Sequence, residues 1–406
     1  MAEQRLPRLR ALDIRPIFQD GRSLLMLRDP LQLSERAVII PRELAPVLAF
    51  LDGSRDLAGL RAALMVRLGL RFDMALLERL VAVLDESFLL ENERFLAAKT
   101  DALAAYRNAP FRPPLSAGQG YPEEADALRQ MLDSYLHGRP HSQPRSSFPV
   151  RGLLTPHIDY ARGGPVYAAV WGEAAESIEN AELAVILGTD HWGSDGTFTL
   201  TRQNYATPYG VLPTAQGVVD VLAEAIGSEE AFAGELHHRT EHSIELAAVW
   251  LHHMRQGRPC EIVPILCGSF GHFIRNAIQP REDQTIQALV ATLQQVISAQ
   301  PTLIVAAGDL AHVGPAFGDQ PLDLSARAQL QAADEQLIRE IIAGDAEGFF
   351  QSISRVQDRY NICGLPPIYL ALRLLSPTSG ALVAYDRCPA DAQGTSVVSV
   401  CGVLFS

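Results

Sequence analysis

Long apolar runs are missing from this chain of 406 residues, so the sequence predicts no membrane-spanning helix. The first residues, MAEQRLPRLRALDIRP, carry arginines but lack the apolar stretch of a signal peptide. Cysteine is scarce: there are five, an odd number at wide spacing, which does not form a disulfide framework. We therefore expect a cytoplasmic protein in a reducing environment, with no membrane partner.

Lysine is nearly absent too, because almost every basic residue is arginine, and we attribute this to codon bias. Charge is unevenly distributed along the chain. Residues 1–115 carry 17 Lys+Arg against 15 Asp+Glu, close to +2, while residues 116–406 carry 17 against 32, close to −15. An acidic body repels phosphate backbones, and the helices expected near the N-terminus offer no basic stripe. These features exclude nucleic acid as an expected partner.

Residues 1–95 have the pattern of a small α+β domain. A DG turn separates two apolar runs in LDIRPIFQDGRSLLMLRDP (12–30), which predicts a β-hairpin. Apolar residues then recur at three- and four-residue spacing, and a short strand, FLLEN, closes the unit. The predicted helices are PRELAPVLAFLDG (41–53), LAGLRAALMVRLGL (57–70) and DMALLERLVAVLDES (73–87). This order is typical of a winged-helix-like module.

The stretch from LMLRDP through FLLENER resembles the PqqD-like domains, which bind leader peptides in peptide-modifying pathways. Its best local match is AFLDGSRDLAGLRAAL (49–64). The resemblance implies that a peptide docks on this domain as an added strand, and SLLMLRD (23–29) is the candidate edge. The alternative is a helical cap that stabilises the larger domain.

Residues 96–150 are expected to form a helical connection that ends in HGRPHSQPRSSFP (137–149), a Pro-, Ser- and Arg-rich linker. From residue 151 to 406, buried strands alternate with amphipathic helices. That alternation predicts an α/β domain, with a central sheet covered by helices on both faces.

Three predicted strands each deliver an imidazole just past the carboxyl end. His157 follows the strand at 151–155, Asp190 and His191 follow the strand at 183–187, and Asp309 and His312 follow the strand at 302–307. In open α/β sheets, ligands bind at this edge. A buried imidazole needs partners for both nitrogens, so three at equivalent positions favour a functional site over core packing.

Two further segments carry groups suited to the same site. Glu241 and His242 begin a predicted helix, where a carboxylate is favoured by the helix dipole, so a simple helix start is the alternative. Cys363 lies in a turn before another helix, a position that lowers a thiol pKa and suits a metal ligand or nucleophile. The alternative for an isolated cysteine is a small buried apolar residue.

With these residues in view, the chain resembles the MEMO family, whose bacterial members are often called AmmeMemoRadiSam system protein B. The likeness begins near residue 116 and rests on eight motifs in order: SAGQGYP, TPHIDY, ILGTDHW, TPYG, EHSIE, IVPILCG, GDLAH and NICGLPP. The family is similar in fold to class III extradiol dioxygenases. Its members bind iron or copper through two histidines and a cysteine.

The resemblance implies that His157, His191 and Cys363 are the metal ligands. It places the family's nearby Asp and His on Asp309 and His312. The helix-start pair corresponds to Glu241 and His242.

Three positions depart from the family pattern. PHIDY replaces the usual PHAGY and introduces Asp159, and TDHW replaces PSHH and introduces Asp190 and Trp192. We expect these three side chains to line the pocket beside the metal, which makes the transfer of any one substrate from the family unsafe.

Two imidazoles and one thiolate suit iron, copper or zinc and leave open positions, which is a catalytic arrangement. We expect His312 to be the acid/base group and Asp309 to fix its tautomer. The first hypothesis is a metal-dependent redox enzyme acting on a small molecule or peptide. The alternatives are a non-catalytic peptide- or ligand-binding protein and a zinc-dependent hydrolase.

Overall fold

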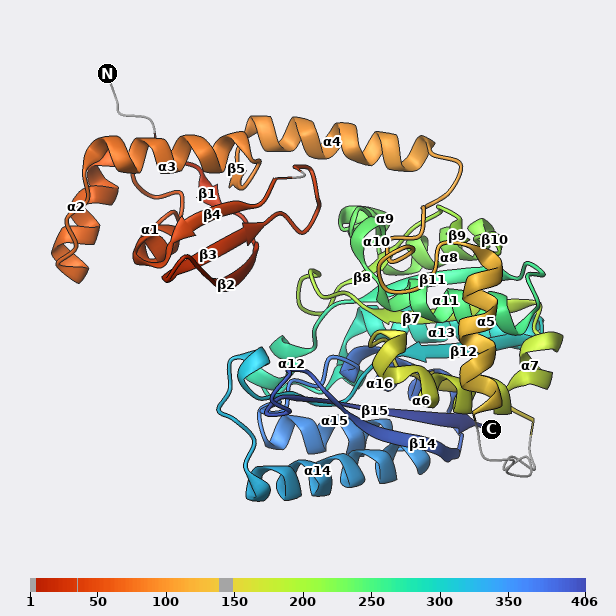
Figure 1. Ribbon diagram of the computed structural model, residues 1–406. Helices are drawn as coiled ribbons and strands as arrows, with labels where there is room; N and C mark the ends of the chain where they lie inside the picture. Colours follow the sequence, from red (N-terminus) through yellow and green to blue (C-terminus); the bar gives the residue numbers. More distant parts are fainter. Residues whose placement is uncertain (1–4, 35, 139–148) are drawn as a thin grey trace. The chain divides into compact units, whose positions relative to one another are not determined.

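The computed structural model describes residues 5–34, 36–138 and 149–406 (Figure 1). It divides into two compact units, Met1–Ala109 and Pro110–Ser406. The linker predicted from HGRPHSQPRSSFP lies mostly outside the described residues, at 139–148.

The first unit contains the predicted hairpin. Strands β2 (Asp13–Gln19) and β3 (Arg22–Arg28) pair antiparallel, and Asp20 and Gly21 both adopt positive φ between them. Such a turn matches the twist of the two strands. The remaining elements of the unit are β1 (Arg8–Leu9), β4 (Val38–Pro41), α1 (Ala45–Ala49), α2 (Leu57–Leu68), α3 (Met74–Glu86), β5 (Leu90–Glu91) and α4 (Glu93–Asn108).

The sheet order corrects one expectation. The order is β2-β3-β4, so SLLMLRD forms the central strand and cannot offer a free edge. Within the described residues, β2 and β4 are the edges of this sheet. Pro16 in β2 agrees with that place, because proline lacks the N–H that a central strand needs. The likeness to PqqD-like domains stays a prediction.

The boundary between the units also differs from the expected one at residue 95. Helix α4 belongs to the first unit, since Phe95 is buried there and the Arg10 guanidinium lies 3.9 Å from its ring centroid. Helix α5 (Ala125–His137) belongs to the second unit, with Leu128 and Leu132 buried in its core. The expected helical connection is therefore divided between the two units.

The second unit is built on an eight-stranded mixed sheet of order β13-β15-β6-β12-β7-β11-β8, with β14 paired to β15. Strands β6, β12, β7 and β11 are parallel, and the strands that flank them, β15 and β8, run antiparallel to them. The strands are β6 (Gly152–Thr155), β7 (Leu183–Thr189), β8 (Phe198–Leu200), β11 (Glu261–Cys267), β12 (Thr302–Ala307), β13 (His312–Val313), β14 (Gly380–Pro389) and β15 (Val397–Phe405); β9 (Tyr205–Thr207) and β10 (Gly210–Leu212) form a separate hairpin.

Helices cover both faces of this sheet, which confirms the predicted α/β fold. Alternate strand residues enter two different cores: Leu154 and Val185 face one, Leu153 and Ile186 the other. The helices are α6 (Tyr160–Glu173), α7 (Ala175–Asn180), α8 (Gln216–Ile226), α9 (Ser228–Ala233), α10 (His237–Thr240), α11 (Ser243–Met254), α12 (Gly271–Arg275), α13 (Gln284–Ala299), α14 (Leu324–Ile342), α15 (Ala346–Arg355) and α16 (Leu365–Leu375).

Strand order decides where the polar groups meet. Because β6, β12 and β7 are neighbouring parallel strands, the residues that follow them share one edge of the sheet. In the described ranges, no helix combines the length and apolar character that crossing a bilayer requires.

Candidate metal centre

The structure brings together the two histidines and the cysteine that the sequence singled out. His157 follows β6, His191 follows β7, and Cys363 lies in the turn before α16. One ligand atom from each lies within 4.8 Å of the others. The Cys363 Sγ is 3.2 Å from the His157 Nε2, and the rings of His157 and His191 have centroids 5.2 Å apart. These donors are close enough to share one ion.

The opposite nitrogen of each imidazole is held by the protein. The His157 Nδ1 lies 3.1 Å from the Ala307 carbonyl oxygen, and the His191 Nδ1 lies 2.9 Å from the Glu241 carboxylate. Both neighbours are acceptors, so each Nδ1 carries a hydrogen, and each Nε2 is the nitrogen whose lone pair a metal could take once the ring is neutral. Partners of this kind orient the ligand rings before any ion binds.

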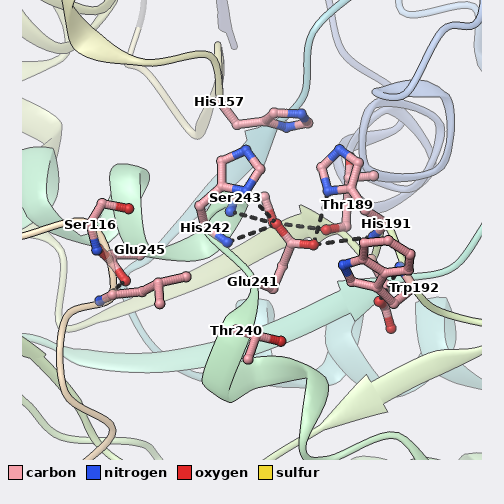
Figure 2. A network of polar contacts seen from close by, with 12 residues as sticks. Ser116, His157, Thr189, His191, Trp192, Thr240, Glu241, His242, Ser243 and Glu245 are labelled. Atoms are coloured by element: carbon pink, nitrogen blue, oxygen red, sulfur yellow. Dashed lines mark hydrogen bonds and ion pairs between the residues drawn. The ribbon is translucent and has the colours of Figure 1, made fainter. Parts of the chain in front are cut away.

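Glu241 is 2% exposed and accepts several hydrogen bonds at once (Figure 2). Its oxygens lie 3.1 Å from the His191 backbone nitrogen, 2.8 Å from that of His242 and 3.0 Å from that of Ser243. It also lies 3.0 Å from the His242 Nδ1. Burial opposes ionisation, but the His191 and His242 imidazoles hold the pKa of the Glu241 carboxyl well below its usual value.

Cys363 is set up to be a thiolate. Burial alone would raise the pKa of its thiol, yet His157 and His312 outweigh that effect and lower the pKa well below its usual value. Burial would likewise lower the pKa of His157, but the Cys363 and Asp309 charges raise it to about 9. Without a metal, the proton therefore resides on the imidazole, and metal binding must displace it.

Asp309 does not act as expected. Its Oδ1 accepts the His157 backbone N–H at 2.9 Å, and its Oδ2 lies 3.7 Å from the His157 Nε2. The His312 Nδ1 instead lies 3.3 Å from the Leu310 carbonyl. Asp309 thus orients His157 rather than His312, although it belongs to a group with His312 and Cys363 whose ligand atoms lie within 4.8 Å of one another.

The three positions that depart from the family pattern differ in place. Asp159 caps α6 and pairs with Arg162, so it belongs to the helix start and not to the described metal-capable groups. Asp190 is buried and its carboxylate lies 2.8 Å from the His237 Nδ1, so its partner is outside the cluster as well. Trp192 lies beside His191, as Figure 2 shows. Neither aspartate belongs to a metal-capable group among the described residues, and the expectation that both line the pocket stays a prediction.

Two glycines that sequence reasoning missed allow the Cys363 turn to approach the sheet. A Cβ on Gly308 would lie 2.7 Å from the Gly364 Cα, and a Cβ on Gly364 would lie 2.5 Å from the Asp309 carbonyl oxygen. The Gly364 N–H donates to that carbonyl at 2.9 Å. Gly308 belongs to the motif GDLAH and Gly364 to NICGLPP. A glycine next to a candidate ligand indicates a close approach of two backbone segments, and this feature could have been used to predict the contact.

We expect Gly308→Ala to lower the free energy of unfolding of the second unit by about 1–3 kcal/mol, because the methyl group meets backbone that cannot move freely. The three tryptophans, Trp171, Trp192 and Trp250, all lie in that unit, so a urea titration followed by their fluorescence reports on it alone. Gly217→Ala is the control, since its Cβ would have no neighbour within 4 Å. Equal losses in both variants would contradict the close-approach argument.

A histidine outside the cluster provides a pH prediction. His238 is fully buried, with its Nδ1 2.6 Å from the Tyr205 hydroxyl and its Nε2 3.0 Å from the Thr199 carbonyl. Burial lowers its pKa to about 3, against about 6.5 in an unfolded chain. The folded state therefore binds fewer protons, and stability falls as the pH drops below about 6.5.

From these two pKa values we expect His238 to cost about 2 kcal/mol of unfolding free energy between pH 7.5 and pH 5. The comparison is with His238→Gln, measured by tryptophan fluorescence in urea at both pH values. Other groups titrate in the same range, so the quantity that matters is the difference in pH dependence between the two proteins. An identical pH dependence would show that His238 does not titrate as argued.

Comparison with known proteins assigns the chain to a family. Residues 112–404 match the family described as Memo-like protein. A MEMO1 family protein of Aquifex aeolicus is 26% identical over 407 residues, which cover 98% of this chain and 99% of the relative. A MEMO1 family protein of Thermus thermophilus is 28% identical over 76% of this chain and 86% of its own length.

A third relative, a MEMO1 family protein of Nitrosopumilus maritimus, is 24% identical over 68% of this chain and 92% of its own length. The Aquifex similarity also spans the residues of the first unit. Since the family match covers most of the second unit, with its whole sheet and the histidine–cysteine cluster, the chain belongs to the Memo-like protein family.

Proposed function

We propose that His157, His191 and Cys363 bind one metal ion and that the protein is a metal-dependent redox enzyme acting on a small molecule or peptide. The observation that carries this proposal is the convergence of two imidazoles and one thiolate within 4.8 Å. The chemistry of these donors fits iron or copper, with zinc as the alternative. Three protein ligands leave positions open for water, dioxygen or substrate.

An iron or copper ion bound there would supply one-electron chemistry that the side chains cannot provide. The protein's part is to orient and to move protons. His312 is half-buried beside Cys363, and the thiolate and Asp309 raise its pKa against the effect of burial. It is the group placed to give or take a proton at a substrate atom.

Glu241 supports the proposed ligand His191 from behind, and the Ala307 carbonyl supports His157. Outer partners of this kind keep the ligand geometry rigid, which favours fast reaction over slow rearrangement. On the first unit, β2 is the edge strand on which a peptide partner would add, and its own residue Phe18 is 78% exposed. This docking is part of the proposal and concerns that unit by itself.

The test is metal analysis of protein purified anaerobically without added metal, followed by dioxygen uptake in the presence of reductant. We expect close to one equivalent of iron or copper per chain, and uptake that a chelator abolishes. Zinc alone, with esterase or amidase activity and no dioxygen uptake, would favour the hydrolase. Failure to retain or take up any of the three metals would overturn the proposal and leave the ligand-binding alternative.

A further inference from the structure

Arg112 is fully buried, and its guanidinium is surrounded by oxygen acceptors. Its Nε donates to the His238 carbonyl at 2.8 Å, its Nη2 to the Glu241 carbonyl at 2.8 Å and its Nη1 to the Pro113 carbonyl at 3.0 Å. The Nη1 also forms an ion pair with Glu245. Burying a charge is costly, and these four acceptors compensate for the water that the guanidinium has lost. The same contacts hold the guanidinium in one position.

Glu245 completes the arrangement from α11. Its carboxylate accepts the Ser116 backbone N–H at 2.7 Å (Figure 2). It also accepts the Leu115 backbone N–H at 2.7 Å and the Tyr121 hydroxyl at 2.6 Å. Burial opposes its ionisation, but Arg112 and these donors lower the pKa of the Glu245 carboxyl. One carboxylate thereby fixes the chain around residues 112–121 onto α11.

The path from Arg112 to the metal centre is short. The Glu241 carbonyl receives the Arg112 Nη2–H, and the Glu241 carboxylate holds His191 and His242. Glu241 has extended backbone geometry between α10 and α11, and its own N–H donates to the His237 carbonyl at 2.9 Å. Its main chain is thus held on both sides, which determines where its carboxylate lies.

We infer that Arg112 is a positioning residue for the metal centre: through the Glu241 and His238 carbonyls, with Glu245 as its counter-ion, it fixes the carboxylate that orients His191. This inference rests on the proposed metal-binding function. It assigns a role to a segment that precedes the central sheet by some forty residues in sequence, from Arg112 to the start of β6 at Gly152.

Arginine is required here for a geometric reason. Its planar fork presents several N–H groups in fixed directions, so it can bind two backbone carbonyls and a carboxylate together. Lysine keeps the charge for Glu245 but concentrates its donors at one atom. Arg112→Lys therefore removes the positioning while retaining the counter-ion.

The experiment is a Co²⁺ titration of the full chain, followed by its visible absorption, under conditions where tryptophan fluorescence shows each variant to be folded. We expect Arg112→Lys to weaken Co²⁺ binding about tenfold, the lower end of the loss seen for outer partners of metal ligands, and to change the band shape. The matched control is Arg255→Lys. Arg255 also donates to main-chain carbonyls of the second unit, those of Ile178 and Ala181, away from the cluster.

A double variant separates positioning from stability. Arg112→Met with Glu245→Gln removes both buried charges, so no lone carboxylate remains to unfold the protein. Its Co²⁺ affinity should stay about as low as that of Arg112→Lys. Wild-type affinity in both Arg112 variants, or an equal loss in Arg255→Lys, would overturn the inference while leaving the metal site standing. A wild-type protein that does not bind Co²⁺ would overturn both.

Discussion

Cys363→Ser is expected to abolish the thiolate-to-metal charge-transfer band and to weaken Co²⁺ or Cu²⁺ binding by more than about 100-fold. This loss of affinity exceeds the one expected when a residue that only supports a metal ligand is replaced. A serine hydroxyl remains protonated near neutral pH, so the site keeps two neutral imidazoles and loses its anionic ligand. The thiolate is favoured here because His157 and His312 lower the pKa of the Cys363 thiol, outweighing burial.

The measurement is a metal titration followed by absorption, with the apo variant checked for folding by tryptophan fluorescence. Cys260→Ser is the matched control. Cys260 is also buried, but it precedes β11, at the end of the parallel strands opposite to the cluster, and its Sγ lies 3.7 Å from the Ala181 carbonyl. A Cys363→Ser protein that binds metal as tightly as the control would remove Cys363 from the ligand set.

Glu241→Gln is expected to weaken metal binding by about 10–100-fold with little change in fold. An amide has one acceptor oxygen, whereas the carboxylate serves two imidazoles through separate oxygens. The amide NH₂ would oppose the Nδ1–H of either His191 or His242 and turn that ring. The weaker binding should be accompanied by an altered coordination geometry, which changes the positions and intensities of the Co²⁺ absorption bands.

The control for that substitution is Glu235→Gln. Glu235 is a buried carboxylate of the same unit whose Oε1 accepts the Thr201 hydroxyl at 2.9 Å. If both variants weaken metal binding alike, the effect is a general consequence of losing a buried charge, and Glu241 has no special role. If only Glu241→Gln alters the Co²⁺ absorption bands, the Glu241 carboxylate affects the metal by orienting the His191 and His242 imidazoles.

Much of the site could be predicted because strand ends are legible in sequence. Continuous apolar runs identify buried parallel strands, and the residues just after them must share one edge. His157 and His191 could be placed in this way, and the turn before a helix indicated Cys363 before the family motifs supported it. The partner of Asp309 could not be predicted from the sequence. Whether its carboxylate contacts His157 or His312 depends on distances of a few ångströms in the folded protein.

Other features of the structure had signals that were available locally. Asp159 stands three residues before Arg162 at a helix start, which is the spacing of a side-chain cap. Pro16 marked β2 as an edge strand and so implied that SLLMLRD was central. The pairing of Arg112 with Glu245 could not be predicted in this way, because 133 residues separate them and no sequence pattern links Arg112 to the EHSIE motif.

The contact between Cys363 and His157 joins residues 206 positions apart, which has a consequence for biosynthesis. Chains fold from the N-terminus as they are made, and contacts of such long range form late. The cluster closes only when the turn before α16 reaches β6 and β12, after the four parallel strands β6, β7, β11 and β12 have been made. We therefore expect the chain to fold first, as a stable apoprotein, and to bind its metal ion afterwards. This order differs from that of small domains in which metal binding drives folding.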